Sequence, residues 1–426
     1  MSIIQSCLLP VFSPPLHSTP SIWLDEPYTP REPLKGSHTC DIAVLGGGIV
    51  GVTAAYFLMR KKIGKIALLE ANTIASGATG NNAGMLSVDR ACDYGRWCDT
   101  PERRNIAKTT LQISERTQRL IRDIITEHDI RCDYKISGCA WVPTDDAGEQ
   151  AASHSLTAMQ EDGFSVLPLT QDTLKALYPH ARDLYPGYYF PNHGELHSAR
   201  YVRGLAEVVE REGETIWEQS PVHAFHPHNN GMRLQTAQGT IDCGEVVLAC
   251  NAYLSKLLPS VASIMRTYRG QIIGMIAPQE SLMRMPLCSE TAGKRPIYYG
   301  RSLPNGKIIF GGGRGEDQKT EEAHAFDKEA MEPVQAAITS YLHTYFPKIA
   351  ALPVTHRWSG TMAEPKDSMP LIGPSGCFPH TTIIAGMCGN GMGAWGTASA
   401  EMGANFVASD RCKAPHPLFD PKRFGL

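Results

Sequence analysis

A glycine-rich stretch near the amino terminus, DIAVLGGGIVGVTAAYFLMR at residues 41–60, restricts the fold more than any other part of the chain. It has no charge between Asp41 and Arg60, and its length is close to that of a membrane span. A continuous helix is nevertheless disfavoured by three consecutive glycines, which separate a β-prone half from a helical half. We therefore predict a strand, a tight turn and a helix in a doubly wound α/β sheet, and no membrane span.

The turn has the spacing G-x-G-x-x-G, which is typical of dinucleotide binding. The first glycine allows the tight turn, the second lets a pyrophosphate approach the backbone, and the third lets the helix pack closely on the strand. The helix amides face the phosphates, and a carboxylate after the next strand, residues 65–69, suits the ribose. The motif alone does not distinguish NAD from FAD. Its predicted cofactor contacts are Gly46, Gly48, Ile49, Val50, Gly51, Glu70 and Ala71.

A second loop, ANTIASGATGNNAGML at residues 71–86, is dominated by small and polar residues. One interpretation is a flexible linker. The other is a loop whose amides and Thr79 hydroxyl hold a phosphate or cover a ring, and the apolar end of the loop favours this reading. The predicted contacts here are Thr79, Gly80, Asn81, Asn82, Ala83, Gly84 and Met85.

A second glycine turn lies near the carboxyl terminus, in TTIIAGMCGNGMGAWGTASAEMGANFVAS at residues 381–409. A strand over 381–385 is expected to meet the turn, and a helix begins near Met392. The helix amino terminus favours a negative charge, such as that of a reduced flavin near N1 and the C2 carbonyl; the alternative is ordinary tight strand–helix packing. Glycine turns at both ends of the chain favour FAD over NAD. The predicted contacts are Gly389, Asn390, Gly391, Met392 and Gly393.

Composition excludes several classes of protein. The 426 residues are 42% apolar, enough for two domains, and a net charge of −3 implies no basic surface for nucleic acid. The twelve cysteines form no C-x-x-C pair, so we expect reduced thiols in a cytoplasmic protein. We predict no metal site, because the runs HGELH and HAFHPH are typical of loop histidines. Oligomeric state is left open.

The amino-terminal 37 residues form a separate segment. Seven prolines before residue 34 block helix and sheet interiors, and the segment lacks the pattern of a signal peptide. We predict an extended arm over the body, held by Trp23 and Leu24.

Several motifs together carry a family resemblance, covering about residues 20–424. They are SIWLDEP, PLKG, DIAVLGGGIVG, GATGNNAG, AGML, HSARYVRGLAEVVEREG, EVVLACNAY, PIYYGRSLPNGKIIFGGG, W-S-G-T…D-S-M-P-L-I-G, IAGMCGNGMG and FDPKRF, in this order apart from one overlap. The chain resembles the D-amino acid oxidase (DAO) family of FAD enzymes, which includes glycine oxidase and sarcosine oxidase. It is most similar to the branch of γ-glutamylputrescine oxidase.

The resemblance implies a glutathione-reductase-like FAD-binding Rossmann domain and a substrate domain built on a mixed β-sheet. We expect residues 38–130, 196–265 and 351–426 to form the discontinuous FAD domain, and 131–195 and 266–350 the substrate domain. The resemblance also implies cofactor contacts at Val222, where backbone atoms hold adenine, and at Ala249 and Gly360.

The implied reaction is oxidation of a C–N bond in an amine or amino acid. A neutral amine would lose a hydride to flavin N5, the imine would hydrolyse, and molecular oxygen would accept the electrons and give hydrogen peroxide. Two alternatives stay open. One is a dehydrogenase of the same fold that passes electrons to a quinone or a protein, and the other is a flavin-binding subunit without turnover.

Two departures from the family pattern affect these expectations. Asn81 stands where many members have an arginine that helps to bind substrate or activate oxygen, which motivates the dehydrogenase alternative. Sarcosine oxidases attach FAD through a cysteine near the position of Gly360, but the sequence has no cysteine between Arg357 and Leu371. We therefore expect FAD to be bound non-covalently.

The substrate side is predicted at residues 296–312, which are typical of two strands around a Pro-Asn-Gly turn. Tyr298 and Tyr299 would point to opposite faces of the first strand. One or both would form an aromatic wall for an amine, and Arg301 would pair with a carboxylate. Core packing is the alternative for either tyrosine, and a solvated loop position is the alternative for the arginine.

Overall fold

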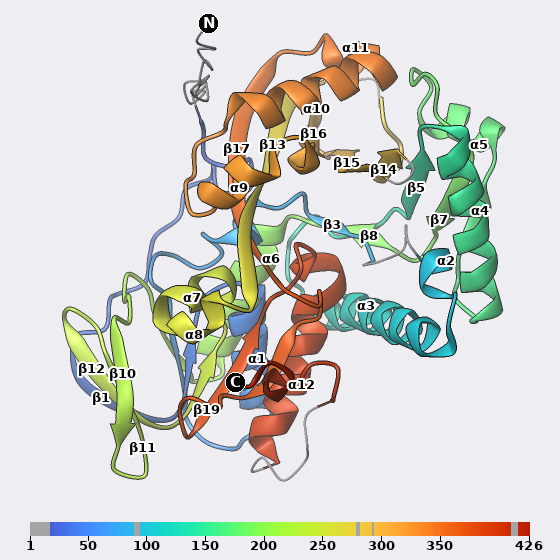
Figure 1. The fold of residues 1–426 in the computed structure, drawn as a ribbon. Coiled ribbons are helices and arrows are strands. Elements are labelled where there is room, and N and C mark those ends of the chain that lie inside the picture. Colours follow the sequence, from blue (N-terminus) through green and yellow to red (C-terminus); the bar gives the residue numbers. More distant parts are fainter. Residues whose placement is uncertain (1–17, 89–93, 278–281, 292–293, 410–415) are drawn as a thin grey trace, which may run out of the picture.

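The structure is a computed structural model and describes residues 18–88, 94–277, 282–291, 294–409 and 416–426. Two eight-stranded sheets organise it, one in the lower half of Figure 1 and one in the upper half. This mixed α/β arrangement confirms the predicted fold class.

The first sheet has the order β10-β11-β12-β1-β2-β9, with β19 beside β12 and β18 beside β19. Its centre is parallel, because β1 pairs in parallel with both β2 and β12. Apolar residues alternate between the two faces, so each face has its own core cluster. The strands are β1 (Gly36–Leu45), β2 (Ile66–Leu69), β9 (Thr215–Trp217), β10 (Ala224–His228), β11 (Gly231–Gln235), β12 (Gly239–Leu248), β18 (Leu371–Pro374) and β19 (Thr381–Ala385).

Helices cover this sheet. In Figure 1, α1 (Ile49–Lys61), α6 (Ser198–Arg211) and α12 (Gly396–Ala408) gather in the lower half, and α1 packs against the other two. The predicted strand, glycine turn and helix at residues 41–60 are confirmed, since β1 ends at Leu45 and α1 begins at Ile49. Among the described residues, no helix combines the length and apolarity that crossing a bilayer would require.

The second sheet has the order β17-β13-β16-β15-β14-β5-β7-β6. The predicted hairpin is confirmed, as β15 and β16 pair antiparallel around the Pro-Asn-Gly turn. The strands are β5 (Cys139–Pro143), β6 (Leu167–Leu169), β7 (Gly187–Phe190), β13 (Met265–Ile276), β14 (Leu287–Thr291), β15 (Lys294–Ser302), β16 (Lys307–Gly312) and β17 (Val354–Pro365).

Helices cap the upper half at two places. The helices α9 (Gln318–Ala323), α10 (Glu332–Tyr345) and α11 (Pro347–Ala350) lie over β13, β16 and β17, whereas α4 (Asp146–Glu161) and α5 (Gln171–Leu177) lie beside β5–β7 (Figure 1). The shorter helices of the body are α2 (Tyr94–Trp97), α7 (Leu254–Leu257) and α8 (Pro259–Ala262).

A three-stranded sheet lies between the two large ones in Figure 1 and has the order β3-β8-β4. It consists of β3 (Met85–Leu86), β8 (Gly194–Glu195) and β4 (Lys135–Ile136). Because β3 forms the last two residues of the second predicted cofactor loop, this small sheet connects that loop to β4 and β8.

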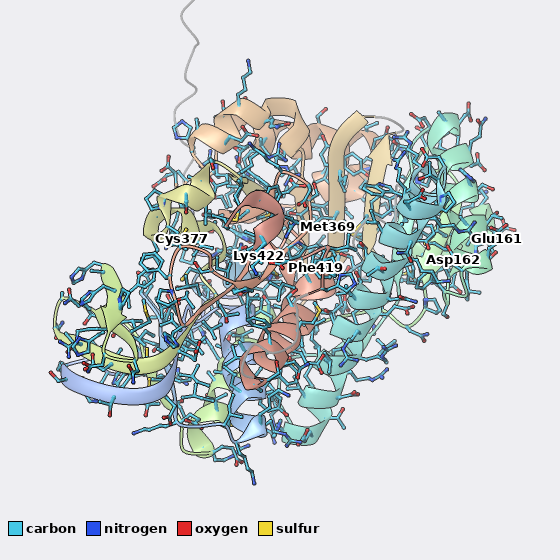
Figure 2. All side chains as sticks on the ribbon, turned by 60° about the horizontal axis from the view of Figure 1, so that its bottom comes forward. Glu161, Asp162, Met369, Cys377, Phe419 and Lys422 are labelled. Carbon is cyan, nitrogen blue, oxygen red and sulfur yellow. The ribbon has the colours of Figure 1, made fainter. Side chains whose placement is uncertain are left out.

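Two sets of ion pairs fasten the periphery. The long helix α3 (Pro101–His128) is joined to the end of α4 by Arg104, which lies 3.0 Å from both Glu161 and Asp162. Both acidic residues are labelled in Figure 2. At the carboxyl end, the Phe419 ring is buried on Trp395, and Arg423 pairs with Asp367.

The predicted domain segments remain a proposal. The strands of the first sheet all fall in the segments assigned to FAD binding, apart from the first two residues of β1. Most strands of the second sheet fall in the substrate segments. The exceptions are Met265, the first residue of β13, and all of β17, which the prediction assigns to the FAD domain although β17 pairs along nearly its whole length with β13.

Candidate FAD and substrate site

The first glycine turn is shaped by close contacts that exclude side chains. A Cβ added at Gly51 would lie 1.8 Å from the Gly46 carbonyl oxygen, so helix and strand meet at a distance only glycine permits. Gly46 has a φ of 112°, and its own Cβ would lie 2.7 Å from the Ala249 carbonyl oxygen. Gly46, Gly51 and Ala249 thus lie together at the end of β1.

The amides of the turn are partly engaged by protein oxygens. The Ile49 N–H donates to the Thr79 hydroxyl at 2.9 Å, and the Gly47 N–H donates to the Glu70 carboxylate at 2.6 Å. Glu70 also accepts from the Asn72 N–H. Burial is the main influence on the Glu70 carboxyl and raises its pKa, although the backbone donors oppose it. The turn, the second loop and Glu70 therefore form one unit.

Hydrogen bonds within the second loop hold it in one conformation. The Asn81 amide donates to the Ser76 and Gly77 carbonyls at 3.1 and 2.8 Å. The Asn82 side chain donates to the Thr79 carbonyl and accepts from the Gly84 N–H. These contacts support the interpretation of residues 71–86 as a built loop and not a flexible linker.

Strand β17 packs directly on this loop. The Trp358 indole donates to the Asn81 carbonyl at 3.1 Å, and a Cβ at Gly360 would lie 3.0 Å from the Asn81 Cβ. Gly360 therefore lies beside the second loop, and its predicted contact with the cofactor stays a prediction.

The carboxyl-terminal glycine turn approaches the same place. A Cβ at Gly393 would lie 2.4 Å from the Ser87 carbonyl oxygen, and the Asn390 amide donates to that oxygen at 3.3 Å. A π-helical turn, Gly391–Trp395, precedes α12, and Met392 within it is buried. Gly389 has a φ of 77°. The two glycine turns, from opposite ends of the chain, thus contact the same segment, the first at Thr79 and the second at Ser87.

Two predicted contacts lie at the other edge of the unit. Ala71 directly follows Glu70, and Val222 lies two residues after Ser220, whose N–H donates to the Glu70 carbonyl at 2.9 Å. Their position next to the carboxylate fits the adenosine end of a dinucleotide.

The hairpin tyrosines separate as their alternation predicts. The Tyr298 ring stacks on Tyr341 of α10, with centroids 4.1 Å apart, and so packs in the core of the substrate half. The Tyr299 ring packs on the opposite side, beside Met85, Cys139 and Cys288. Tyr299 is therefore the tyrosine that borders the cofactor loop, whereas the geometry gives no support to a substrate contact for Tyr298.

Arg301 is buried and occupied by protein groups. It is 3% exposed, and its guanidinium donates to the Gly84 and Leu196 carbonyls at 3.0 and 2.9 Å. It also lies 3.3 Å from the Glu195 carboxylate. Burial lowers the pKa of Arg301 to about 10, and Glu195 opposes the shift. These contacts support a role in fastening the cofactor loop to β8, in place of the predicted pairing with a substrate carboxylate.

Comparison with known proteins identifies the family of the chain. The profile of the DAO family, described as FAD dependent oxidoreductase, matches residues 41–404. The chain belongs to this family. The γ-glutamylputrescine oxidoreductase of Escherichia coli K12 is 26% identical over 355 residues, covering 81% of this chain and 79% of the relative.

Solved structures agree on the fold. L-proline dehydrogenase from P. horikoshii superimposes with a TM-score of 0.74 at 22% identity, covering 92% of this chain and 98% of that one. Glycine oxidase from Geobacillus kaustophilus gives a TM-score of 0.71 at 20% identity, covering 91% and 98%.

The residues present fit the FAD that this family uses. Gly48 offers no Cβ between the turn and Thr79. The first backbone amides of a helix lack intrahelical partners, and the N-cap residue of α1, Gly48, has no side chain that could cap them. The backbone N–H groups of Val50 and Gly51 can therefore donate to a pyrophosphate. Glu70, at the end of β2 beside the turn, would hold the ribose, and the carboxyl-terminal glycine turn would offer backbone amides to the ring. The chain is an FAD-dependent oxidoreductase of the DAO family.

One residue of this region is absent from the sequence predictions. Arg314 begins the short 3₁₀ helix η3 (Arg314–Asp317), one residue after the end of β16. Its guanidinium carbon lies 4.2 Å from the centre of the Tyr268 ring. The run GGGRGED at 311–317 is the signal that could have identified it, since an arginine follows three glycines at the end of a predicted strand.

Proposed function

We propose that the protein oxidises the C–N bond of an amine or amino acid, with molecular oxygen as electron acceptor. The observation that supports the proposal is that the second loop, which contacts both glycine turns, also adjoins the buried apolar cluster beside Tyr299. Relatives named glycine oxidase and γ-glutamylputrescine oxidoreductase support the same bond type.

FAD, when bound, supplies an acceptor for the hydride at N5 and passes the electrons on. The chain's own residues bind and orient. Cys139, Cys288 and Met85 form a buried apolar cluster next to Tyr299, which excludes water from the reacting carbon. Burial raises the pKa of Tyr299 to about 12, so its phenol stays protonated and can donate a hydrogen bond at neutral pH. A neutral amine needs no protein base to lose a hydride.

Asn81 favours a second candidate, a dehydrogenase that uses a quinone or protein acceptor. Its amide is bound to two loop carbonyls, so this position provides no positive charge toward oxygen.

The proposal also includes non-covalent binding of FAD and a location in the cytoplasm. It leaves the oligomeric state open. The nine free thiols found among the described residues are compatible with that compartment.

The test is the visible absorption spectrum of the purified protein, recorded anaerobically while amines and amino acids are added singly. We expect one compound to bleach the flavin bands and air to restore them. Bleaching that recovers only with an added quinone would establish the dehydrogenase. A flavin that no compound reduces would overturn the proposed function, and acid precipitation that leaves flavin on the protein would contradict non-covalent binding.

A further inference from the structure

Two cysteines lie directly opposite each other in the first sheet. In the parallel ladder of β1 and β12, Cys40 is the register partner of Cys243. Both side chains pack on the same face, in the apolar cluster on one side of this sheet. Neighbouring strands lie about 4.8 Å apart, and a disulfide can join Cα atoms that are about 4.4–6.8 Å apart. The ladder therefore holds two free thiols at a distance that a disulfide can span.

The two thiols already interact in the reduced protein. The hydrogen bond with Cys40 is the largest influence on the Cys243 thiol and raises its pKa, and burial acts in the same direction. The Cys243 Sγ also lies 3.6 Å from the carbonyl oxygen of Met232 on β11. Because each thiol faces the other, little side-chain movement is needed to bring the two sulfurs into contact.

The two thiols differ in their access to solvent. The first four residues of β1 are exposed, and Cys40 is half-buried at the point where this strand enters the core. Cys243 is only 6% exposed. In Figure 1, this part of the sheet, with β1, β10, β11 and β12, projects from the body at the lower left. A small oxidant from solvent therefore meets Cys40 first, with Cys243 behind it.

Other cysteines do not share this arrangement. Cys139 and Cys288 lie in one buried cluster on the neighbouring strands β5 and β14, but the register partner of Cys288 is Trp141, two residues beyond Cys139. Such diagonal neighbours are about 7–8 Å apart, which is too far for a disulfide without backbone movement. Within the ranges that the structure describes, Cys40 and Cys243 are the one pair of cysteines that are register partners.

From this geometry we propose that Cys40 and Cys243 form a site of reversible oxidation, at which hydrogen peroxide converts the two thiols into a disulfide between β1 and β12. The site itself does not depend on the proposed function. The source of the oxidant does, since an oxidase of this kind releases hydrogen peroxide as its own product.

The reaction proceeds in two steps. The Cys40 sulfur, as thiolate, attacks one peroxide oxygen, the O–O bond breaks, and a sulfenic acid and, after protonation, one water are formed. The Cys243 sulfur then attacks the Cys40 sulfur, the S–O bond breaks, and the hydroxyl leaves as a second water with the proton of Cys243. In total, two thiols and one peroxide give one disulfide and two waters, and two electrons pass from the sulfurs to the peroxide.

The first test uses added peroxide. The FAD-loaded protein is treated with hydrogen peroxide, the remaining thiols are alkylated, and the chain is digested without reductant for mass spectrometry. Cleavage after Glu245 is included, because it separates Cys243 from Cys250. We expect a linked pair of peptides that contain Cys40 and Cys243 and that dithiothreitol separates again.

Three variants control this measurement. Cys40→Ser and Cys243→Ser should each abolish the linked pair. Cys377→Ser, which removes an exposed thiol outside the ladder, should form it at the rate of the parent. Peroxide that leaves both thiols free, or that gives only sulfinic or sulfonic acid at Cys40, overturns the inference, and so does a link from Cys40 to any other cysteine.

The second test uses the protein's own turnover. The parent is incubated in air with a compound that reduces its flavin, with and without catalase. We expect the Cys40–Cys243 link to form, and catalase to suppress it. Free thiols after turnover, at a peroxide concentration that forms the link when added, would overturn the assignment of the product as oxidant. If no compound reduces the flavin, the proposed function fails, while a link formed by added peroxide still supports the site.

Discussion

At the scale of the residue, Gly51 is the most constrained position in the cofactor turn. We predict that Gly51→Ala destabilises the protein by about 1–3 kcal/mol, as overpacking does, and lowers the flavin content, because the new methyl would lie 1.8 Å from the Gly46 carbonyl oxygen. Thermal unfolding and the ratio of flavin to protein absorbance measure both effects. Gly77→Ala is the control in the second loop, since its Cβ would meet nothing within 4 Å. Equal losses in the two variants would contradict the packing argument.

His193 gives a pH dependence to stability. It is 4% exposed and stacks on Phe190 at 4.4 Å, and burial lowers its pKa to about 3. In the unfolded state His193 is protonated below about pH 6.5, whereas in the folded state it stays neutral down to about pH 3. The free energy of unfolding therefore decreases as the pH falls below about 6.5, by up to about 1.4 kcal/mol per pH unit. Urea unfolding at pH 7 and at pH 5.5 gives the free energy of unfolding at each pH. Between these two pH values, we expect it to fall by about 1 kcal/mol less in His193→Phe than in the parent. Parallel losses would show that other groups are responsible.

At the scale of the element, the buried pair of Arg269 and Glu321 fixes α9 on β13. Arg269→Ala leaves Glu321 buried without its partner, and we expect a loss of about 3–5 kcal/mol in the free energy of unfolding. Arg266→Ala on the same strand breaks ion pairs with Glu322 and Glu364, but the Arg266 side chain is 39% exposed and the loss should be about 1 kcal/mol. The urea midpoints of the two variants compare them directly. Similar midpoints would mean that the buried pair does not hold α9.

Secondary-structure elements could be predicted from the sequence better than contacts between distant side chains. β1, α1, β19 and the β15–β16 hairpin follow from glycines, turn residues and apolar runs, which are local signals. The hydrogen bonds of Arg301 are long-range contacts. Its guanidinium donates to the carbonyls of Gly84 and Leu196, which are 217 and 105 residues away in the chain. The placement of β17 and the approach of Arg314 to Tyr268 likewise depend on how distant elements meet. No spacing in the sequence reports such contacts.

At the scale of the whole molecule, two long strands join the halves. In Figure 1, β13 and β17 run from the upper sheet down toward the cofactor half, and they pair along nearly their full length. The end of β17 reaches the carboxyl-terminal glycine turn, where the Cys388 N–H donates to the Ala363 carbonyl at 2.9 Å. Strand β17 therefore connects the substrate sheet to the carboxyl-terminal glycine turn through backbone hydrogen bonds.

The amino-terminal arm makes a second connection between the halves. Its described part is bound to β17 through the Thr19 N–H and the Arg357 carbonyl, at 2.9 Å. Further along, the Trp23 indole donates to the Asn82 carbonyl of the cofactor loop. The Trp23 ring is buried under the Arg301 guanidinium, 5.1 Å from its centre. The arm thus holds the outer side of the loop that meets FAD.

This arrangement predicts that Trp23 contributes to FAD affinity without touching the substrate. Trp23→Phe keeps an aromatic ring but removes the donor to Asn82, and a lost hydrogen bond of about 1 kcal/mol corresponds to a roughly fivefold weaker FAD complex. Trp23→Ala also removes the packing and should weaken it further. Titration of the FAD-free protein with FAD, followed by quenching of flavin fluorescence, measures both. If Trp23→Ala binds FAD as tightly as the parent, the loop keeps its shape without the arm, and the hydrogen bonds of Asn81 and Asn82 alone suffice to form the site.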